Sequence, residues 1–173
     1  MMRVLIVYES MFGNTAVVTE AVAAGLRPYA EVTMCPVAEA ATRPAPLVDL
    51  LVVGAPTHAF GLSRAATRRD AASRTESPVE VEVGVREWLD AALPLPTPRL
   101  AAAFGTKIAR PPWLPGSAAK GIGNRLRRLG YHLVTPPTDF YVEDMTGPLR
   151  TGELGRATSW AARLATTRSA LPT

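Results

Sequence analysis

The residues best suited to chemistry follow the first apolar segment of the chain. Residues 3–8 are predicted to form a buried strand, and after Glu9 the chain continues with Ser10-Met11-Phe12-Gly13-Asn14-Thr15. From Val18 to Leu26 apolar side chains recur every four residues, which predicts a helix over residues 15–26 packed on a sheet. The polar loop therefore joins a strand to the start of a helix.

A loop of this kind can bind a phosphate group through backbone atoms. The first N–H groups of a helix have no acceptor within the helix, and they lie at the positive end of its dipole. A phosphate is therefore stabilised there without Arg or Lys. Ser10 and Thr15 would add hydroxyl donors, and Gly13 lets the chain turn at positive φ. The same residues could instead form a capped strand-to-helix turn that binds no ligand.

Two later segments repeat this pattern of a buried strand followed by a polar or glycine-containing loop. The first is Leu50-Leu51-Val52-Val53, followed by Gly54-Ala55-Pro56-Thr57-His58-Ala59-Phe60-Gly61. The second runs from Leu100 to Phe104, followed by Gly105-Thr106-Lys107 and a loop that contains Trp113. In open α/β sheets ligands bind at the carboxyl ends of the strands, so the three loops predict one shared site.

Together the three segments resemble the flavodoxin family. The family's phosphate loop, Ser/Thr-x-Thr-Gly-x-Thr, is similar to residues 10–15, and a Gly-x-Pro-Thr segment is present at residues 54–57. The resemblance implies non-covalently bound FMN, with its phosphate on residues 10–15 and its flavin ring between the second and third loops. Phe12 stands where the family has its middle Thr, which removes one hydroxyl from the phosphate shell.

The resemblance also assigns the contacts with the cofactor. Backbone groups at Ala59, Gly61, Gly105 and Thr106 would bind the polar edge of the ring, which His58, Phe60 and Trp113 would flank or border. Each of these three side chains has another possible role, since His58 could hold the loop, Phe60 could be core and Trp113 could pack on nearby prolines. The full set of expected cofactor-binding residues is Ser10, Met11, Phe12, Gly13, Asn14, Thr15, Pro56, Thr57, His58, Ala59, Phe60, Gly61, Phe104, Gly105, Thr106, Lys107 and Trp113.

Strands and helices alternate along the chain, which predicts a parallel sheet covered on both faces. We expect strands over residues 3–8, 31–36, 49–53, 99–105 and 132–135, and helices over 15–26, 63–73, 85–93, 117–129 and 152–166. In the last helix, Leu154, Ala157, Ala161 and Leu164 are expected to face inward. The resemblance implies a three-layer α/β/α sandwich with five strands in the order 2-1-3-4-5.

Two segments bear on the type of protein within that fold. Residues 136–144 leave little room for the insertion of long-chain flavodoxins, so the short-chain type is expected. Residues 64–82 lack clear periodicity and are either a mobile or partner-contacting insertion or a tolerated surface excursion.

Length and composition fit one domain spanning residues 1–173. The apolar runs are shorter than the roughly 20 residues that a membrane span needs, and residues 4–8 are too short for the apolar core of a signal peptide. The single cysteine, Cys35, cannot form an internal disulfide and fits a reducing compartment, where we expect it to act as a small buried hydrophobe. A cytoplasmic protein is expected.

Several other functions are disfavoured by the residues present. The net charge is +4, but the arginines are scattered and do not alternate with aromatic residues, which argues against nucleic-acid binding. Two histidines serve a metal site poorly, and the Gly-x-Ser-x-Gly motif of serine hydrolases is absent. Phosphoacceptor domains of similar fold need an acidic cluster near the end of the first strand and an acceptor Asp at the end of the third, where this chain has Glu9-Ser10 and Gly54-Ala55.

The expected function is electron transfer by bound FMN between a reductase and an acceptor, either a redox partner protein or a small molecule. The main alternative is an FMN-dependent oxidoreductase that takes hydride from NAD(P)H and reduces a quinone or another small molecule. A flavin-free binding module is a third possibility. Arg64, Lys107 and Arg110 follow the second and third loops, so we expect a higher flavin potential than in acidic carriers of the family.

Overall fold

The computed structural model describes residues 1–109 and 115–168, and it contains one central sheet. Its parallel path runs β2 (Ala30–Pro36), β1 (Met2–Tyr8), β3 (Leu50–His58), β5 (Arg99–Ile108) and β6 (Tyr131–Leu133). Counted along the chain these are the five predicted strands, and the predicted order 2-1-3-4-5 is confirmed. Two short strands extend the sheet: β4 (Gly61–Leu62) pairs antiparallel with β3, and β7 (Thr138–Val142) pairs parallel with β5.

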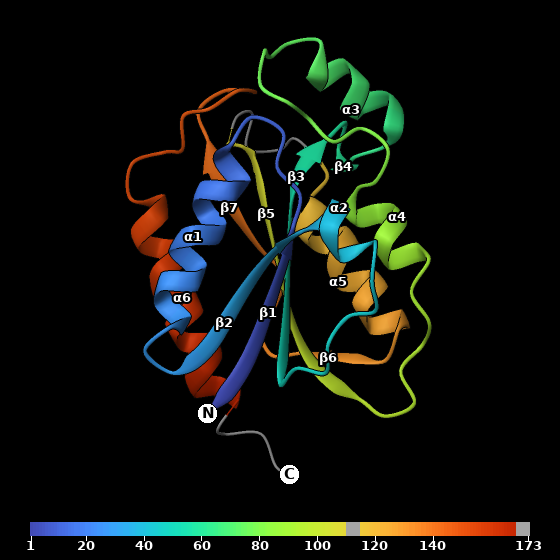
Figure 1. Cartoon of the computed structure of the whole chain (residues 1–173). Helices are drawn as coiled ribbons and strands as arrows, with labels where there is room; N and C mark the ends of the chain where they lie inside the picture. Colours follow the sequence, from blue (N-terminus) through green and yellow to red (C-terminus); the bar gives the residue numbers. More distant parts are fainter. Residues whose placement is uncertain (110–114, 169–173) are drawn as a thin grey trace.

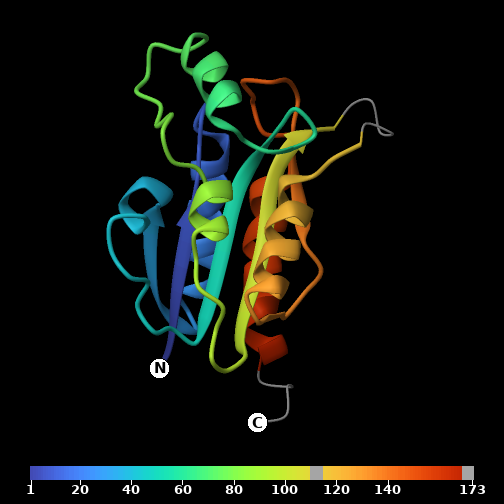
Figure 2. The same cartoon turned by 90° about the vertical axis from the view of Figure 1, so that its right-hand side faces the viewer.

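Helices cover both faces of the sheet, as the predicted sandwich requires (Figures 1 and 2). On one face lie α1 (Asn14–Leu26) and α6 (Glu153–Arg168), and on the other lie α2 (Val37–Ala40), α4 (Val85–Asp90) and α5 (Ala118–Arg128). The short helix α3 (Ala65–Ala72) sits beyond the carboxyl ends of the strands. Among the described helices, none combines the length and the apolarity that crossing a membrane would require.

The predicted apolar stripes of the helices are largely confirmed. Val18, Val22 and Leu26 of α1 are fully buried against the sheet, as are Ile122 and Leu126 of α5 on the opposite face. Cys35 is buried on β2, as expected.

The prediction for Leu154 is wrong, because this side chain is 43% exposed in the first turn of α6. Trp160 takes part in the inward stripe instead, and its ring meets Phe104 and Phe140 edge to face at centroid distances of 6.0 and 5.9 Å. The stripe therefore starts one turn later than the sequence pattern suggested, at Ala157.

Two strands continue beyond the ends predicted from the sequence, which were Val53 and Gly105. Gly54–Pro56 of β3 pair with Phe104–Thr106 of β5, and residues 104–108 of β5 pair with β7. These ladders hold the glycine and proline residues in extended conformation, although such residues usually mark loops. Residues of the predicted second and third loops therefore lie on strands.

The fifth predicted strand, residues 132–135, is divided. β6 ends at Leu133, and the chain rejoins the edge of β5 as β7 at Thr138. Pro136 and Pro137 lie between the two parts, where they lack the N–H donor that an uninterrupted ladder would need. This interruption is short, as the expected short-chain type requires.

Candidate functional site

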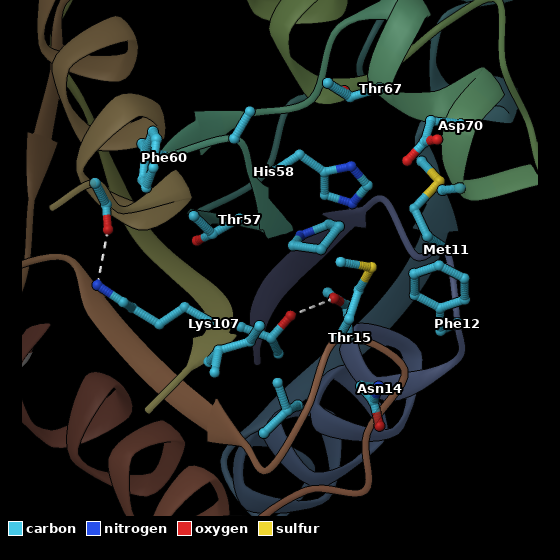
Figure 3. A pocket seen from close by; sticks show the side chains of 18 of the residues that line it. Met11, Phe12, Asn14, Thr15, Thr57, His58, Phe60, Thr67, Asp70 and Lys107 are labelled. Carbon is cyan, nitrogen blue, oxygen red and sulfur yellow. Dashed lines mark hydrogen bonds between the residues drawn. The ribbon is translucent and has the colours of Figure 1, made fainter. Parts of the chain in front are cut away.

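A cavity of about 270 Å³ opens at the carboxyl ends of the strands (Figure 3). Its walls come from the β1–α1 loop, the β3–β4 hairpin, the end of β5, helix α3 and the segment after β7. The lining residues are Met11, Phe12, Asn14, Thr15, Pro56, Thr57, His58, Ala59, Phe60, Thr67, Asp70, Ala71, Arg74, Thr106, Lys107, Ile108, Pro115, Gly116, Val142 and Met145. The three segments singled out in the sequence thus meet at one place.

The β1–α1 loop has the backbone geometry of an anion site. Gly13 is the N-cap of α1 and has φ +92°, a conformation that glycine adopts without strain. A Cβ atom built on Gly13 would meet nothing within 4 Å, so the space on that side of the loop is free. The first turn of α1 has no acidic residue, which leaves its positive end to an external anion.

Hydroxyl groups hold this loop in place. The Ser10 hydroxyl accepts a hydrogen bond from the N–H of Ala16 at 3.2 Å, so it caps the first turn of α1. The Thr15 hydroxyl is buried and lies 2.8 Å from that of Thr106 at the end of β5 (Figure 3). This contact joins the first and third predicted segments at the floor of the cavity.

The β3–β4 hairpin places an aromatic side chain at the rim of the cavity. Its two turn residues, Ala59 and Phe60, have φ of 44° and 71°, as in the two-residue turns that suit the twist of a hairpin. Residues other than glycine pay about 1–3 kcal/mol for such a conformation. The Phe60 side chain is 58% exposed, so the prediction that it contacts a ligand fits its position better than a role in the core.

Lys107 brings a positive charge to the same part of the cavity. Its Nζ atom donates a hydrogen bond to the carbonyl of Gly116 at 2.8 Å (Figure 3). Gly116 has φ +96° and packs so closely on the hairpin that an added Cβ would lie 1.9 Å from the carbonyl oxygen of Phe60. Lys107 is thereby held beside the hairpin.

His58 projects from the end of β3 into the cavity (Figure 3). Burial lowers the pKa of its imidazole, and the positive charge of Arg68 lowers it further, while Asp70 acts in the opposite direction. The imidazole is therefore neutral at pH 7. It offers one donor and one acceptor to a ligand.

Helix α3 and the turn that follows it supply a polar wall that was not predicted from the sequence. Thr67, Asp70, Ala71 and Arg74 line the cavity, and Arg74 Nε donates to Asp70 Oδ2 at 3.1 Å. Asp70, Ala71 and Arg74 follow Thr67 by three, four and seven residues, and this spacing places side chains on one face of a helix. The spacing is visible in the sequence, but without an apolar stripe on the opposite face it does not show which way the polar face points.

A buried polar network anchors α3 behind the cavity. The guanidinium of Arg68 is fully buried and donates to the Ser63 hydroxyl, the carbonyl of Val81 and the carboxylate of Glu87, each within 2.9 Å. These bonds fix both ends of the segment over residues 64–82. Whether this segment also contacts a partner stays a prediction.

The same network reaches the base of the β1–α1 loop through Glu9. The Glu9 carboxylate accepts hydrogen bonds from the Ser63 hydroxyl at 2.5 Å and from the N–H of Val85, the first residue of α4, at 2.8 Å. Burial raises the pKa of Glu9, although these hydrogen bonds and the charge of Arg68 act in the opposite direction.

The expected cofactor-binding residues divide into four groups. Eleven of them line the cavity: Met11, Phe12, Asn14, Thr15, Pro56, Thr57, His58, Ala59, Phe60, Thr106 and Lys107. Ser10 and Gly13 lie in the same loop without lining it, and Gly61 lies just beyond the hairpin turn. Trp113 and Arg110 fall outside the described residues.

Two residues of the expected set lie away from the cavity. Phe104 is fully buried in the core beneath Gly54, where an added Cβ would lie 2.1 Å from its ring, so its side chain is not part of the site. Gly105 packs against the start of α5, where a Cβ atom added to Gly105 would lie 3.0 Å from the backbone N atom of Ala119. Arg64, expected near a flavin, is exposed at the start of α3 and does not line the cavity.

The arrangement as a whole can hold a phosphorylated, largely apolar ligand. The start of α1 provides backbone N–H groups for the phosphate, while Pro56, Phe60 and Val142 provide apolar surface beside it. No group of three or more His, Cys, Asp or Glu residues in the described part of the chain is arranged to hold a metal ion. These features fit FMN, the cofactor that the resemblance implies.

Known proteins share the overall structure without close similarity in sequence. No protein-family model matches the sequence, and no curated protein matches it either. Among solved structures, flavodoxin 2 from Bacillus cereus aligns with a TM-score of 0.69 and 18% identity, over 95% of this chain and 98% of that chain.

Two further structures give the same result. A flavodoxin from Archaea aligns with a TM-score of 0.62 and 17% identity over 96% of this chain and 99% of that one. A WrbA-like flavodoxin protein from Agrobacterium tumefaciens aligns with a TM-score of 0.61 and 19% identity over 98% and 99% of the two chains. At these identities the likeness is one of fold, and the chain therefore has the flavodoxin fold, as its three polar segments predict.

Proposed function

We propose that this chain binds FMN and acts as a redox protein that carries electrons between a reductase and an acceptor. The observation that carries the proposal is the start of α1, where Gly13 at φ +92° opens the helix N-terminus onto a cavity with apolar walls. A phosphate at the helix N-terminus and a flat apolar ring beside it would satisfy both features.

The residues have distinct roles in this proposal. Backbone N–H groups of Asn14 and Thr15, which have no acceptor within the helix, would bind the phosphate. Phe60 and Pro56 would contact the ring, and His58 would offer a hydrogen bond at its edge. Bound FMN would supply the electron-transfer chemistry, while the protein positions it and controls access to it.

Phe12 remains the main departure from the family's phosphate loop. Its side chain lines the cavity, where the family has a hydroxyl group, so it contributes apolar surface and no hydrogen bond to the phosphate. In this proposal the backbone N–H groups of α1 therefore carry most of the phosphate binding.

A second candidate function is that of an FMN-dependent NAD(P)H oxidoreductase. The position of Lys107 favours it, because a cation at the cavity stabilises negative charge on a reduced flavin and so favours hydride acceptance. A substrate in the cavity would then be reduced directly, without a partner protein.

The visible spectrum of the purified protein tests both functions. Flavin absorbance after purification, or after addition of FMN, is the expected result, and a colourless protein that takes up no FMN would contradict both. Anaerobic addition of NADH or NADPH then separates them. Slow bleaching without a partner protein is expected of the carrier, whereas rapid bleaching would establish the oxidoreductase.

A further inference from the structure

A second cavity, of about 640 Å³, lies at the other end of the sheet on the face covered by α4 and α5. Its walls are the α2–β3 connection, helix α4, the connection from α4 to β5, and the starts of β5 and β6. Most of the lining is apolar, and Leu51, Trp88, Leu89 and Leu129 contribute to it. A concave apolar cavity with a few polar groups is typical of small-molecule sites.

A hydrogen bond and an ion pair tie the walls of this cavity to neighbouring elements. The N–H of Leu95 donates to the carbonyl of Leu129 at 2.8 Å, which ties the α4–β5 connection to the end of α5. Arg125 pairs with Asp90 at 2.8 Å and holds α4 against α5. On the opposite wall, Pro44 and Pro46 restrict the backbone of the α2–β3 connection.

The charged groups of the lining indicate what kind of ligand fits. Arg43 is paired with Glu39, and Glu87 is paired with Arg68. Arg99 also lines the cavity, and within the described part of the chain it forms no ion pair. The charge left to a ligand is therefore a single positive one.

A hydroxyl group lies next to this cation. Tyr131 is the register partner of Arg99 on the neighbouring strand β6, and both side chains line the cavity. Burial raises the pKa of the Tyr131 hydroxyl, while the charge of Arg99 acts in the opposite direction, and the protonated hydroxyl can donate a hydrogen bond at pH 7. Asp49, the residue before β3, accepts a hydrogen bond from the N–H of Arg3 on β1 at 2.7 Å.

We infer that the second cavity binds a small amphipathic monocarboxylate. Its carboxylate accepts hydrogen bonds from the Arg99 guanidinium and the Tyr131 hydroxyl, and its apolar body packs against Leu51, Trp88 and Leu129. The site does not depend on FMN, because it lies at the amino ends of the strands, away from the first cavity.

Titration of the full chain with octanoate tests this site. Heat of binding gives the affinity, and the indole N–H signal of Trp88 in an ¹⁵N spectrum, assigned with Trp88→Phe, shows where the ligand sits. Octanoate is expected to bind and to shift the Trp88 signal. Octan-1-ol and octylammonium share its apolar body, and both are expected to bind at least roughly tenfold more weakly.

Two variants form a matched pair on the walls of the same cavity. Arg99→Gln is expected to weaken octanoate binding roughly ten- to hundredfold and to leave the affinity for octan-1-ol unchanged. Arg43→Gln, which removes a cation already paired with Glu39, is expected to change octanoate binding by less than about threefold. Absence of octanoate binding, equal effects of the two variants, or a shift of other signals in place of Trp88 would overturn the inference.

Discussion

Gly13 is the residue on whose backbone conformation the phosphate loop depends most directly. We expect Gly13→Ala to lower the free energy of unfolding by about 1–2 kcal/mol, because φ +92° places a side chain in the left-handed region. Steric contact does not contribute, since nothing lies within 4 Å of the added Cβ. Urea denaturation of the FMN-free protein measures the change.

Gly155 provides the matched control for this substitution. It lies in α6, and a Cβ there would also meet nothing within 4 Å, but its backbone is helical. Gly155→Ala is therefore expected to raise the free energy of unfolding by about 0.5–1 kcal/mol. If both variants raised or both lowered the free energy of unfolding, this would contradict a left-handed backbone conformation at Gly13.

Lys107 and Arg74 both line the first cavity, and Arg74 is paired with Asp70. The charge of Lys107 therefore bears most directly on the proposed flavin potential. Two unit charges about 8 Å apart at an effective dielectric near 20 interact by about 2 kcal/mol, or roughly 90 mV for one electron. Lys107→Gln is expected to lower the reduction potential of bound FMN by tens of millivolts up to about this limit, since solvent screens part of the charge.

Potentiometric titration of the FMN-loaded variants measures this shift. Lys120→Gln removes the other lysine of the chain, an exposed residue on α5 that does not line the cavity, and is expected to leave the potential nearly unchanged. Equal shifts in the two variants would mean that Lys107 acts only through the net charge of the protein.

At the scale of elements, the buried carboxylate of Glu9 couples β1, the start of α3 and the start of α4. Its folded pKa is raised above the usual value of 4.5, so between these two values the folded state binds more protons than the unfolded state. Stability from this group is therefore present at low pH and lost as pH rises through the folded pKa. Glu9→Gln removes this titration.

We compare the free energy of unfolding of wild type with that of Glu9→Gln. The difference, wild type minus variant, should fall as pH rises from about 4.5. Glu87 and the other titrating groups are present in both proteins and cancel to first order. Urea denaturation across the range from about pH 4 to 7 provides the test, and a difference independent of pH would contradict the described burial of Glu9.

The sequence predicted those elements whose apolar pattern matches one regular period. Helix α1 follows such a pattern, and its buried face is as predicted. The ends of β3 and β5 were not predictable, because Gly54, Pro56 and Gly105 locally favour a loop. Pairing with neighbouring strands extends them, and that pairing depends on residues far away in the sequence.

The candidate site was predictable where it uses short local motifs. The β1–α1 loop and the end of β3 contain such motifs, and most of their expected residues line the cavity. The wall formed by α3 was not predictable, since its direction depends on the burial of Arg68 among Ser63, Val81 and Glu87. Phe104 was included in the expected set although its side chain is buried against Phe140 and Trp160, because the apolar run that predicts the strand does not show which face of the sheet this side chain occupies.

At the scale of the whole molecule, the sheet separates two cavities of different chemistry. The first lies at the carboxyl ends of the strands and combines a helix N-terminus with Lys107. The second lies at the amino ends and has Arg99 as its available cation. Both sites favour anionic ligands, in keeping with the net charge of +4.

The central claim is that the first cavity binds FMN through its phosphate at the start of α1. Titration of the FMN-free protein with FMN and with riboflavin, followed by flavin fluorescence, tests it most directly, since the two ligands differ only in the phosphate. We predict one FMN per chain and an affinity at least roughly a hundredfold higher than for riboflavin, as expected for two hydrogen bonds to a charged group. Equal affinities for the two ligands, or no binding of either, would contradict the claim.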